Sequence, residues 1–174
     1  MVIRERQAVD LSACVAALAA VHAVNRYPMR WPDDPAAWLK PHGMLAAWVA
    51  QDTTTGAILG HVALCAVSDE NDAQRWRVAS GSPAPAVGLA EVSRLFVALE
   101  ARGQGLGAQL LAAARQEAQR RQLRPVLKVS SHDQHAIALY ERQGWRRVAS
   151  VSMPWSVTDP SDALLHYYLG PEFQ

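Results

Sequence analysis

The chain has 174 residues, of which 50% are hydrophobic, enough for one compact domain with a substantial core. Its 17 Lys and Arg residues against 16 Asp and Glu residues leave a formal net charge of +1. This balance argues against a disordered tail and against a nucleic-acid binder, which needs clustered and unbalanced basic residues. We therefore predict a single domain over residues 1–174 and no nucleic-acid partner.

Targeting and membrane signals are weak. The first residues, Met1 to Arg6, alternate charged and apolar side chains, unlike the continuous apolar run of a signal peptide. The longest apolar stretch, Ala13 to Val24, contains a histidine and falls short of the roughly 20 residues that span a bilayer. Two cysteines, Cys14 and Cys65, are too few for a disulfide framework. We expect a cytoplasmic protein with no membrane partner.

The first third of the chain predicts a strand, two helices and a hairpin. Asp10 occupies the N-cap position before an Ala-rich helical pattern. The segment from Gln51 to Gly56 has turn composition between two apolar runs, which indicates a hairpin. The predicted elements are a strand over Val2–Ala8, helices over Leu11–Val24 and Asp34–Trp38, and strands over Leu45–Ala50 and Ile58–Val67.

The rest of the chain predicts a βαβ unit followed by a helix and two strands. The polar segment Ser68–Pro85 is interpreted as a surface excursion within one core. Leu106, Leu110 and Ala114 mark the apolar face of the crossover helix, so its two strands should be parallel and the crossover right-handed. The predicted elements are a strand over Gly88–Val97, a helix over Gly105–Arg121, a strand over Val126–Val129, a helix over Gln134–Gln143 ended by Gly144, and strands over Arg147–Met153 and Leu164–Leu169.

The strongest chemical signal is Arg102-Gly103-Gln104-Gly105-Leu106-Gly107, between a predicted strand and a predicted helix. Glycines let backbone N–H groups face a ligand, and a helix start offers unpaired donors and a positive dipole end, so the segment suits phosphate. A tight strand-to-helix connection is the alternative. A Walker loop would need Gly-Lys-Ser/Thr, and a Rossmann fingerprint would need an acidic residue where the chain has Leu127 and Lys128.

With Leu95-Phe96-Val97 before it, the R-x-x-G-x-G pattern from Arg102 resembles the GCN5-related N-acetyltransferase (GNAT) family. A second pattern, from Ala136 to Trp145, is similar to the helical half-motif of that family, "N-x-x-A-x-x-L-Y-x-x-x-G-F". The Asn of that motif falls on Asp133, for which a plain N-cap role is an equal alternative.

The resemblance implies an α/β fold of GNAT type, with a mixed, mostly antiparallel sheet whose central parallel strands splay apart and are flanked by helices. It implies acetyl-CoA as co-substrate, no metal, and direct transfer of the acetyl group to an amine of a small molecule or peptide. A homodimer is left open. The residues that it assigns to the cofactor are Leu95, Phe96, Val97, Arg102, Gly103, Gln104, Gly105, Leu106, Gly107, Asp133 and Ala136. The alternatives are a non-catalytic acyl-CoA sensor and an acyltransferase that uses a longer acyl group or a hydroxyl acceptor.

Two side chains are the catalytic candidates. A phenol with a pKa of about 10 can reprotonate a departing thiolate with a pKa near about 8.5, so Tyr140 is proposed as general acid. Glu91 is proposed as the base that accepts the amine proton, because its position matches a glutamate that some family members use. Tyr140 as a core aromatic, and Glu91 as a partner of Arg94 or a lining residue, are the alternatives. A backbone N–H around Phe96 or Val97 is the expected oxyanion donor.

Other reactive side chains predict structure rather than chemistry. Cys65 and His61 share a strand face about 13 Å apart, too far for a thiol–imidazole pair, so both are interpreted as core or pocket-lining residues. The run from His132 to His135 is interpreted as a polar helix start and not as a metal site. Trp31 and Trp38 fit a substrate pocket and a core filler equally well.

Overall fold

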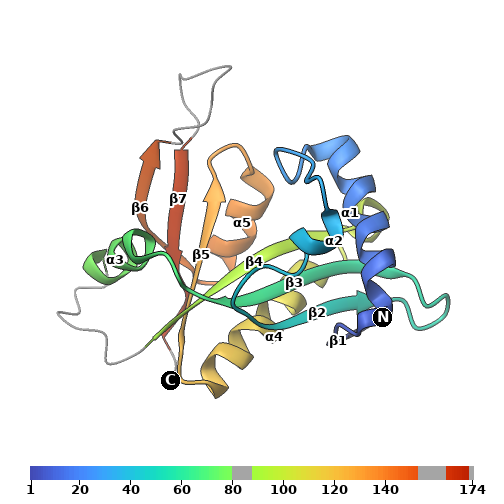
Figure 1. Ribbon diagram of the computed structural model, residues 1–174, viewed down its shortest axis with the longest axis horizontal. Helices are drawn as coiled ribbons and strands as arrows, with labels where there is room; N and C mark the ends of the chain where they lie inside the picture. The colour runs from blue at the N-terminus through green and yellow to red at the C-terminus, as the bar shows by residue number, and fades with distance from the viewer. Residues whose placement is uncertain (80–87, 153–163, 173–174) are drawn as a thin grey trace. The chain divides into compact units, whose positions relative to one another are not determined.

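A computed structural model describes residues 1–79, 88–152 and 164–172 (Figure 1). Within these ranges the strands are β1 (Val2–Glu5), β2 (Met44–Gln51), β3 (Ile58–Ala66), β4 (Leu89–Val97), β5 (Arg124–Ser130), β6 (Arg146–Ser152) and β7 (Leu164–Leu169). The helices are α1 (Leu11–Asn25), α2 (Pro35–Trp38), α3 (Glu70–Ala79), α4 (Leu106–Arg120) and α5 (Gln134–Arg142), with short 3-10 helices η1 (Ala8–Asp10) and η2 (Leu99–Ala101).

The strands form one mixed, mostly antiparallel sheet in the order β1-β2-β3-β4-β5-β7-β6. The β4–β5 pair is parallel, with Leu89, Ala90 and Glu91 opposite Arg124, Pro125 and Val126, as the βαβ pattern predicts. The predicted fold class is confirmed. The parting of the two strands beyond this ladder stays a prediction.

Contacts within the chain divide it into two compact units, each described here by itself. Unit 1 comprises Met1–Cys65 and Val92–Glu117, and unit 2 comprises Ala66–Glu91 and Ala118–Gln174. Strands β3 and β4 and helix α4 contribute residues to both units. The single domain over residues 1–174 stays a prediction.

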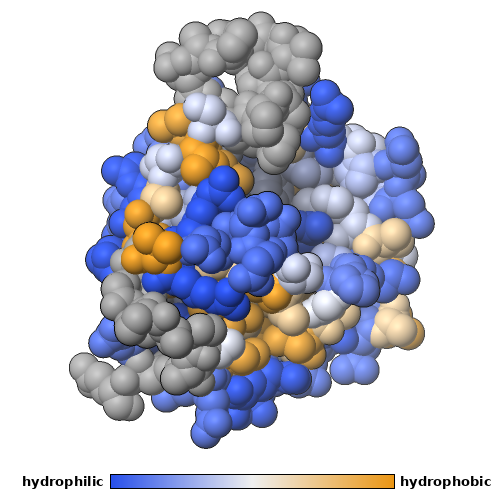
Figure 2. All heavy atoms as spheres, turned by 60° about the vertical axis from the view of Figure 1, so that its left-hand side comes forward, coloured by the Kyte–Doolittle hydropathy of each residue, from blue (hydrophilic) through white to orange (hydrophobic). Residues whose placement is uncertain are grey.

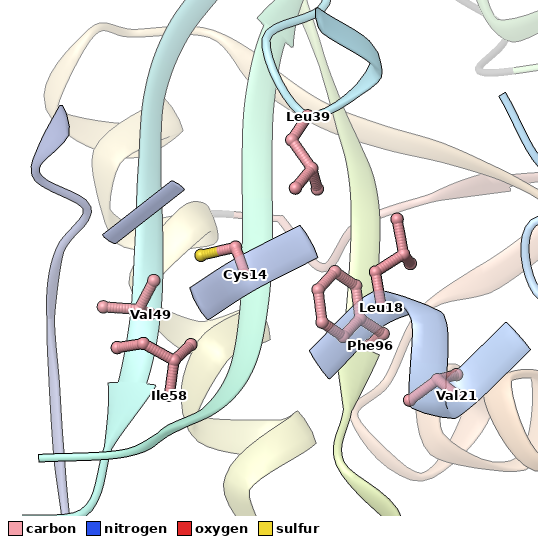
Figure 3. Packing of buried hydrophobic residues seen from close by; sticks show 7 residues of the cluster. All are labelled: Cys14, Leu18, Val21, Leu39, Val49, Ile58 and Phe96. Carbon is pink, nitrogen blue, oxygen red and sulfur yellow. The ribbon is translucent and has the colours of Figure 1, made fainter. Parts of the chain in front are cut away.

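Unit 1 is built on the antiparallel β1-β2-β3 meander, which includes the predicted hairpin. The hairpin turn forms because the Asp52 carboxylate accepts from the N–H groups of Thr54 (2.7 Å) and Thr55 (3.1 Å), and Gly56 adopts φ +76°. One face of α1 packs on this sheet and excludes water (Figure 3). The buried cluster that results comprises Cys14, Leu18, Val21, Leu39, Val49, Ile58 and Phe96.

The start of α1 differs in one detail from the prediction. Asp10 precedes the helix as predicted, but its side chain makes no capping bond to it. Its carboxylate instead accepts two bonds of 2.7 Å from the Arg4 guanidinium and one of 2.6 Å from Gln7 N–H. The hydrogen bond from Arg4 holds the pKa of Asp10 below its ordinary value. The predicted opening strand also stops at Glu5 rather than Ala8.

Unit 2 contains a helix that the sequence did not predict. Residues of the predicted surface excursion form α3, which contacts β6 and β7, and Trp76 is its fully buried anchor. Trp76 packs with Val126, Tyr167 and Leu169. The outer face of α3 is polar apart from the exposed Val78, and Figure 2 shows hydrophilic side chains among apolar ones on this side. Because Ala73 and Trp76 are the only buried side chains among residues 70–78, the apolar period was too sparse to indicate a helix. Residues 80–85 of that segment, and Met153 of another predicted strand, lie outside the described residues.

One described stretch, Ala8–Asn25, is long and apolar enough to cross a membrane by length and composition. Its buried side chains, Cys14, Leu18 and Val21, face the core of unit 1. Packing of these side chains in the core therefore explains part of the apolar character of the stretch Ala8–Asn25.

Candidate functional site

The glycine-rich segment lies in unit 1 between β4 and α4. Gly103 and Gly105 both have φ +76°, a left-handed conformation that costs a residue with a Cβ atom about 1–2 kcal/mol. A Cβ atom would meet nothing within 4 Å at Gly103, and nothing closer than the Gln109 amide, at 3.9 Å, at Gly105. The turn therefore requires glycine for its backbone conformation, and the space above the two Cα atoms is open.

Backbone donors line the same segment. The bond from Gln109 N–H to Gly105 O, of 3.1 Å, opens α4, so the N–H groups of Leu106, Gly107 and Ala108 have no acceptor within the helix. Unpaired donors at the positive end of a helix dipole attract an anion. Open glycines beside unpaired N–H groups thus suit an anion such as phosphate, and contact with coenzyme A stays a prediction.

Arg102 adds a cation to this segment. Its guanidinium donates to the Asn25 side chain (2.9 Å) and to Val97 O (3.4 Å), which ties the loop to the end of α1 and the end of β4. Both acceptors are neutral. These two partners therefore hold the Arg102 side chain in place without offsetting its positive charge.

The end of β4 is held by contacts with β3 in unit 1. Phe96 is buried in the core and stacks on His61 at a centroid distance of 5.6 Å. A Cβ atom at Gly60 would lie 2.9 Å from Phe96 O, so this glycine permits the close approach of β3 to β4. Ala98 N–H closes the strand end by donating to Leu59 O at 2.8 Å. The backbone next to Leu95 and Val97 is thereby fixed in place.

Arg94 is a strained residue within β4. It has φ +54°, which a side chain longer than Asn or Asp seldom adopts. Three contacts maintain it: His61 bonds its carbonyl (3.0 Å), its Nε donates to Trp38 O (3.1 Å), and its guanidinium lies 4.3 Å from the Trp38 ring centroid. Strain of this kind concentrates at functional sites, and sequence reasoning gave no signal of it.

His61 is a buried neutral histidine. Arg6 lies 2.8 Å from His61 Nε2 and can only donate, so Nε2 is the acceptor and the proton resides on Nδ1, which donates to Arg94 O. Burial lowers the pKa of His61 to about 4, with further lowering by the charges of Arg6 and Arg94. The prediction of a core residue is confirmed for His61, and likewise for the buried Cys65.

The second group of predicted site residues lies on α5 in unit 2. Asp133 is its N-cap, and its carboxylate accepts from Ala136 N–H at 3.0 Å. The alternative of a capping role for Asp133 is thus confirmed, and Ala136 N–H already has an acceptor within the chain. The helix ends as predicted, with Gly144 at φ +78°. A cofactor role for Asp133 and Ala136 stays a prediction.

Tyr140 is a buried aromatic on α5, 7% exposed. Its ring centroid lies 6.2 Å from those of Trp145 and Tyr168. The neighbouring Tyr168 hydroxyl donates to the Glu141 carboxylate at 3.0 Å, and burial followed by this bond raises the pKa of Tyr168 to about 12. Packing in this cluster fixes the Tyr140 ring, and its role as general acid stays a prediction.

Glu91 belongs to a charged cluster in unit 2. Its carboxylate lies 3.5 Å from Lys128 Nζ, which also contacts Asp72 on α3 at 2.6 Å. The Tyr167 hydroxyl donates to the same Asp72 at 2.6 Å. Burial opposes ionisation of Asp72, but the hydrogen bonds from Lys128 and Tyr167 outweigh it and lower the pKa of Asp72.

The sequence missed Lys128 and Asp72 as neighbours of Glu91, because Asp72 lies on the unpredicted helix. One local signal was available. Asp69 caps α3 by accepting from Asp72 N–H at 3.0 Å, and Glu70 and Asp72 supply the acidic first turn that favours a helix start.

The two tryptophans differ in their surroundings. Trp38 is partly buried, packs on the core cluster and meets Tyr27 edge-on at 6.0 Å. Trp31 is 39% exposed and lies 5.2 Å from the His22 ring, so it is not a core filler. Within the described ranges, no group of three His, Cys, Asp or Glu side chains is arranged to hold a metal ion.

Comparison with known proteins gives a family and a fold. The model of the Acetyltransferase (GNAT) family matches residues 15–145. A search of curated proteins finds no match. Among solved structures, the chain is similar to the ribosomal-protein-alanine N-acetyltransferase from Brucella melitensis, with a TM-score of 0.70, 21% identity, and 97% and 98% of the two chains covered.

Two further structures have the same fold. A GCN5-related N-acetyltransferase from Kribbella flavida gives a TM-score of 0.69 at 20% identity, covering 98% of this chain and 97% of the other. NAA60 from Arabidopsis thaliana, in complex with a bisubstrate analogue, gives 0.71 at 16% identity, covering 97% and 95%. The likeness therefore extends over nearly the whole chain.

Proposed function

We propose that this chain, which belongs to the acetyltransferase (GNAT) family, transfers the acetyl group of acetyl-CoA to an amine of a small molecule or peptide. The observation that carries the proposal is the segment Arg102–Gly107. Its two left-handed glycines, the open space at their Cβ positions and the N–H groups at the start of α4 together suit a diphosphate.

In this proposal the chain holds coenzyme A by its backbone. The N–H groups of Leu106 and Gly107 would bind diphosphate oxygens, and the Arg102 guanidinium would lie beside them. The β4 backbone from Leu95 to Val97 would pair with the amides of the pantetheine arm, as an added strand does. Acetyl-CoA supplies the acetyl thioester.

The proposed chemistry is direct attack, without a covalent enzyme intermediate. The acceptor nitrogen forms a bond to the acetyl carbon, and the carbon–sulfur bond breaks. Glu91 takes a proton from the amine, and Tyr140 gives a proton to the departing thiolate. Lys128 Nζ, which lies 3.5 Å from the Glu91 carboxylate, would hold that carboxylate in position.

The acceptor class is proposed from two solved structures of the same fold. One structure of the same fold is named for its action on a ribosomal-protein alanine, and another was solved with a bisubstrate analogue. We extend from them only the class of a small-molecule or peptide amine, and we place the reaction in the cytoplasm.

The proposal is tested by incubating the protein with acetyl-CoA and a panel of amines while free thiol is measured. We expect thiol release that depends on one class of amine, with an acetylated product of matching amount by mass spectrometry. Binding of acetyl-CoA without turnover on any amine would favour a sensor, and absence of binding would refute the proposal.

A matched pair of glycine variants tests the cradle. Gly105 and Gly56 both have φ +76°, and a Cβ atom at either would lie 3.9 Å from a glutamine amide. Gly105→Ala and Gly56→Ala should therefore lose similar stability, about 1–2 kcal/mol. Only Gly105→Ala should weaken coenzyme A binding, by at least about tenfold in calorimetry, because its methyl group enters the space assigned to phosphate. Equal affinities for the two variants would contradict the assignment.

A further inference from the structure

The Arg94 guanidinium has donors that no described residue accepts from. Its Nε donates to Trp38 O at 3.1 Å, and its Cζ lies over the Trp38 ring, 4.3 Å from the ring centroid. These contacts already satisfy the carbonyl at the end of α2 and fix the side chain. A guanidinium carries five N–H donors, so the outer edge, formed by Nη1 and Nη2, is left over.

No side chain of the described residues takes up that edge. Within the described ranges Arg94 makes no salt bridge, and its one side-chain hydrogen bond is the bond from Nε. Arg94 is nevertheless half-buried on a strand, where an unpaired charge is costly. The two terminal nitrogens form a rigid, planar fork, which matches the two oxygens of a carboxylate.

The surroundings reinforce the preference for an anion. Arg6, a second half-buried guanidinium, bonds Leu39 O (2.6 Å) and His61 (2.8 Å), and it too lacks a carboxylate partner among the described residues. Between Arg6 and Arg94 lies His61, which is neutral and cannot offset either charge. This part of unit 1 therefore carries two positive charges and an incomplete set of counter-ions.

Aromatic surface adjoins the fork. Trp38 forms the floor on which the guanidinium lies, and Tyr27 meets Trp38 edge-on. This combination of a fixed cationic fork and an aromatic wall suits a small molecule with one planar anionic group and an apolar part.

We infer that Arg94 binds the carboxylate of the acceptor, so that the preferred acceptors are free amino acids with an apolar side chain rather than simple amines or polyamines. The inference rests on the proposed acetyl transfer and names the substrate class of that site. Arg94 is in this reading a specificity-determining residue, whose strained backbone directs its side chain over Trp38.

The test compares acceptors that differ only in the anion. Free L-phenylalanine and L-methionine, their amides and their decarboxylated amines are assayed with acetyl-CoA for wild type, Arg94→Gln and Arg94→Lys. Gln retains a donor for Trp38 O without the charge, and Lys retains the charge without the fork. Lys40→Met, which removes an exposed cation two residues from Trp38, is the control.

We expect wild type to prefer the free amino acids, and Arg94→Gln to lower their kcat/KM by about 10- to 100-fold, mainly through KM. Amides and decarboxylated amines should change by less than about threefold, and Arg94→Lys should recover only part of the loss. Lys40→Met should behave as wild type. Equal use of amides and free acids by wild type would overturn the inference while leaving acetyl transfer intact.

Two outcomes separate this inference from the proposed function and from a role in cofactor binding. If no acceptor is turned over, binding of the same amino acids is measured by calorimetry in the presence of coenzyme A. Binding that Arg94→Gln abolishes supports the carboxylate site, and lack of binding by wild type refutes it. A fall in coenzyme A affinity of Arg94→Gln as large as the fall in kcat/KM would assign Arg94 to the cofactor instead.

Discussion

Acidification should destabilise this protein through His61. The imidazole is fully buried, accepts from Arg6 at Nε2 and donates to Arg94 O at Nδ1, so protonation of Nε2 would place a new cation 2.8 Å from a guanidinium. Because the pKa of His61 is about 4 in the folded state, below the ordinary 6.5, the unfolded chain binds the additional proton first. The contribution of neutral His61 to stability is therefore complete above pH 6.5 and is lost as pH falls toward 4.

The magnitude follows from the difference of pKa values. A fall in pKa from 6.5 to about 4 corresponds to about 3 kcal/mol when fully expressed, and to about 2 kcal/mol at pH 5. That is a large share of the 5–15 kcal/mol that roughly bounds the stability of a natural domain. His61→Gln, which can still donate and accept but does not titrate, should remove this part of the pH dependence.

Urea unfolding of wild type and His61→Gln between pH 5 and 8 measures the difference. The variant should be less stable at pH 7, because it replaces a well-packed ring, and the gap should narrow by about 2 kcal/mol at pH 5. Asp10, Asp52 and Asp72, whose pKa values are lowered, titrate equally in both proteins and cancel. Parallel stability profiles for the two proteins would show that His61 titrates normally, and the inferred tautomer and Arg6 contact would be wrong.

Two further predictions concern α5 and α3. Tyr140→Phe should lower kcat by about 100-fold or more without changing acetyl-CoA affinity. Tyr168→Phe, in the same aromatic cluster, should retain kcat but lose about 1 kcal/mol of unfolding free energy together with its bond to Glu141. Assays of thiol release measure kcat and calorimetry measures affinity, and equal kcat values for the two variants would remove the acid assignment. Trp76→Ala should lose about 3–5 kcal/mol of unfolding free energy, measured by urea unfolding. Val78 is 71% exposed on the same helix, so Val78→Ala should lose less than about 0.5 kcal/mol. A small loss for Trp76→Ala would mean that α3 contributes little to the core of unit 2.

Much of the fold was predictable because its signals are local. The strand β7 has the predicted bounds. Helices α1, α4 and α5 differ from their predicted bounds by no more than one residue at either end. Gly105 and Gly144 were identified from the positions where a helix begins or ends, and both have the left-handed φ that explains their identity. Helix α3 was missed because Ala73 and Trp76 are the only buried side chains among residues 70–78.

The features that could not be predicted depend on contacts distant in sequence. His61 lies 33 residues from Arg94 and 55 from Arg6, so neither its tautomer nor its lowered pKa leaves a trace in the local pattern. The same holds for Asp72, which meets Lys128 across 56 residues. Periodicity reports which face of an element is buried, and it does not report which polar groups meet there.

The departures from local rules in unit 1 gather around one strand. Arg94 has a backbone conformation that favours glycine, and His61 is a buried imidazole held neutral between two guanidiniums. Gly60 has no side chain, which allows β3 to approach Phe96 closely. Each departure lowers stability by itself, so packing alone does not account for the set. Together they fix the β4 backbone and direct the Arg94 guanidinium, as the proposed transfer from a thioester to a carboxylate-bearing amine would require.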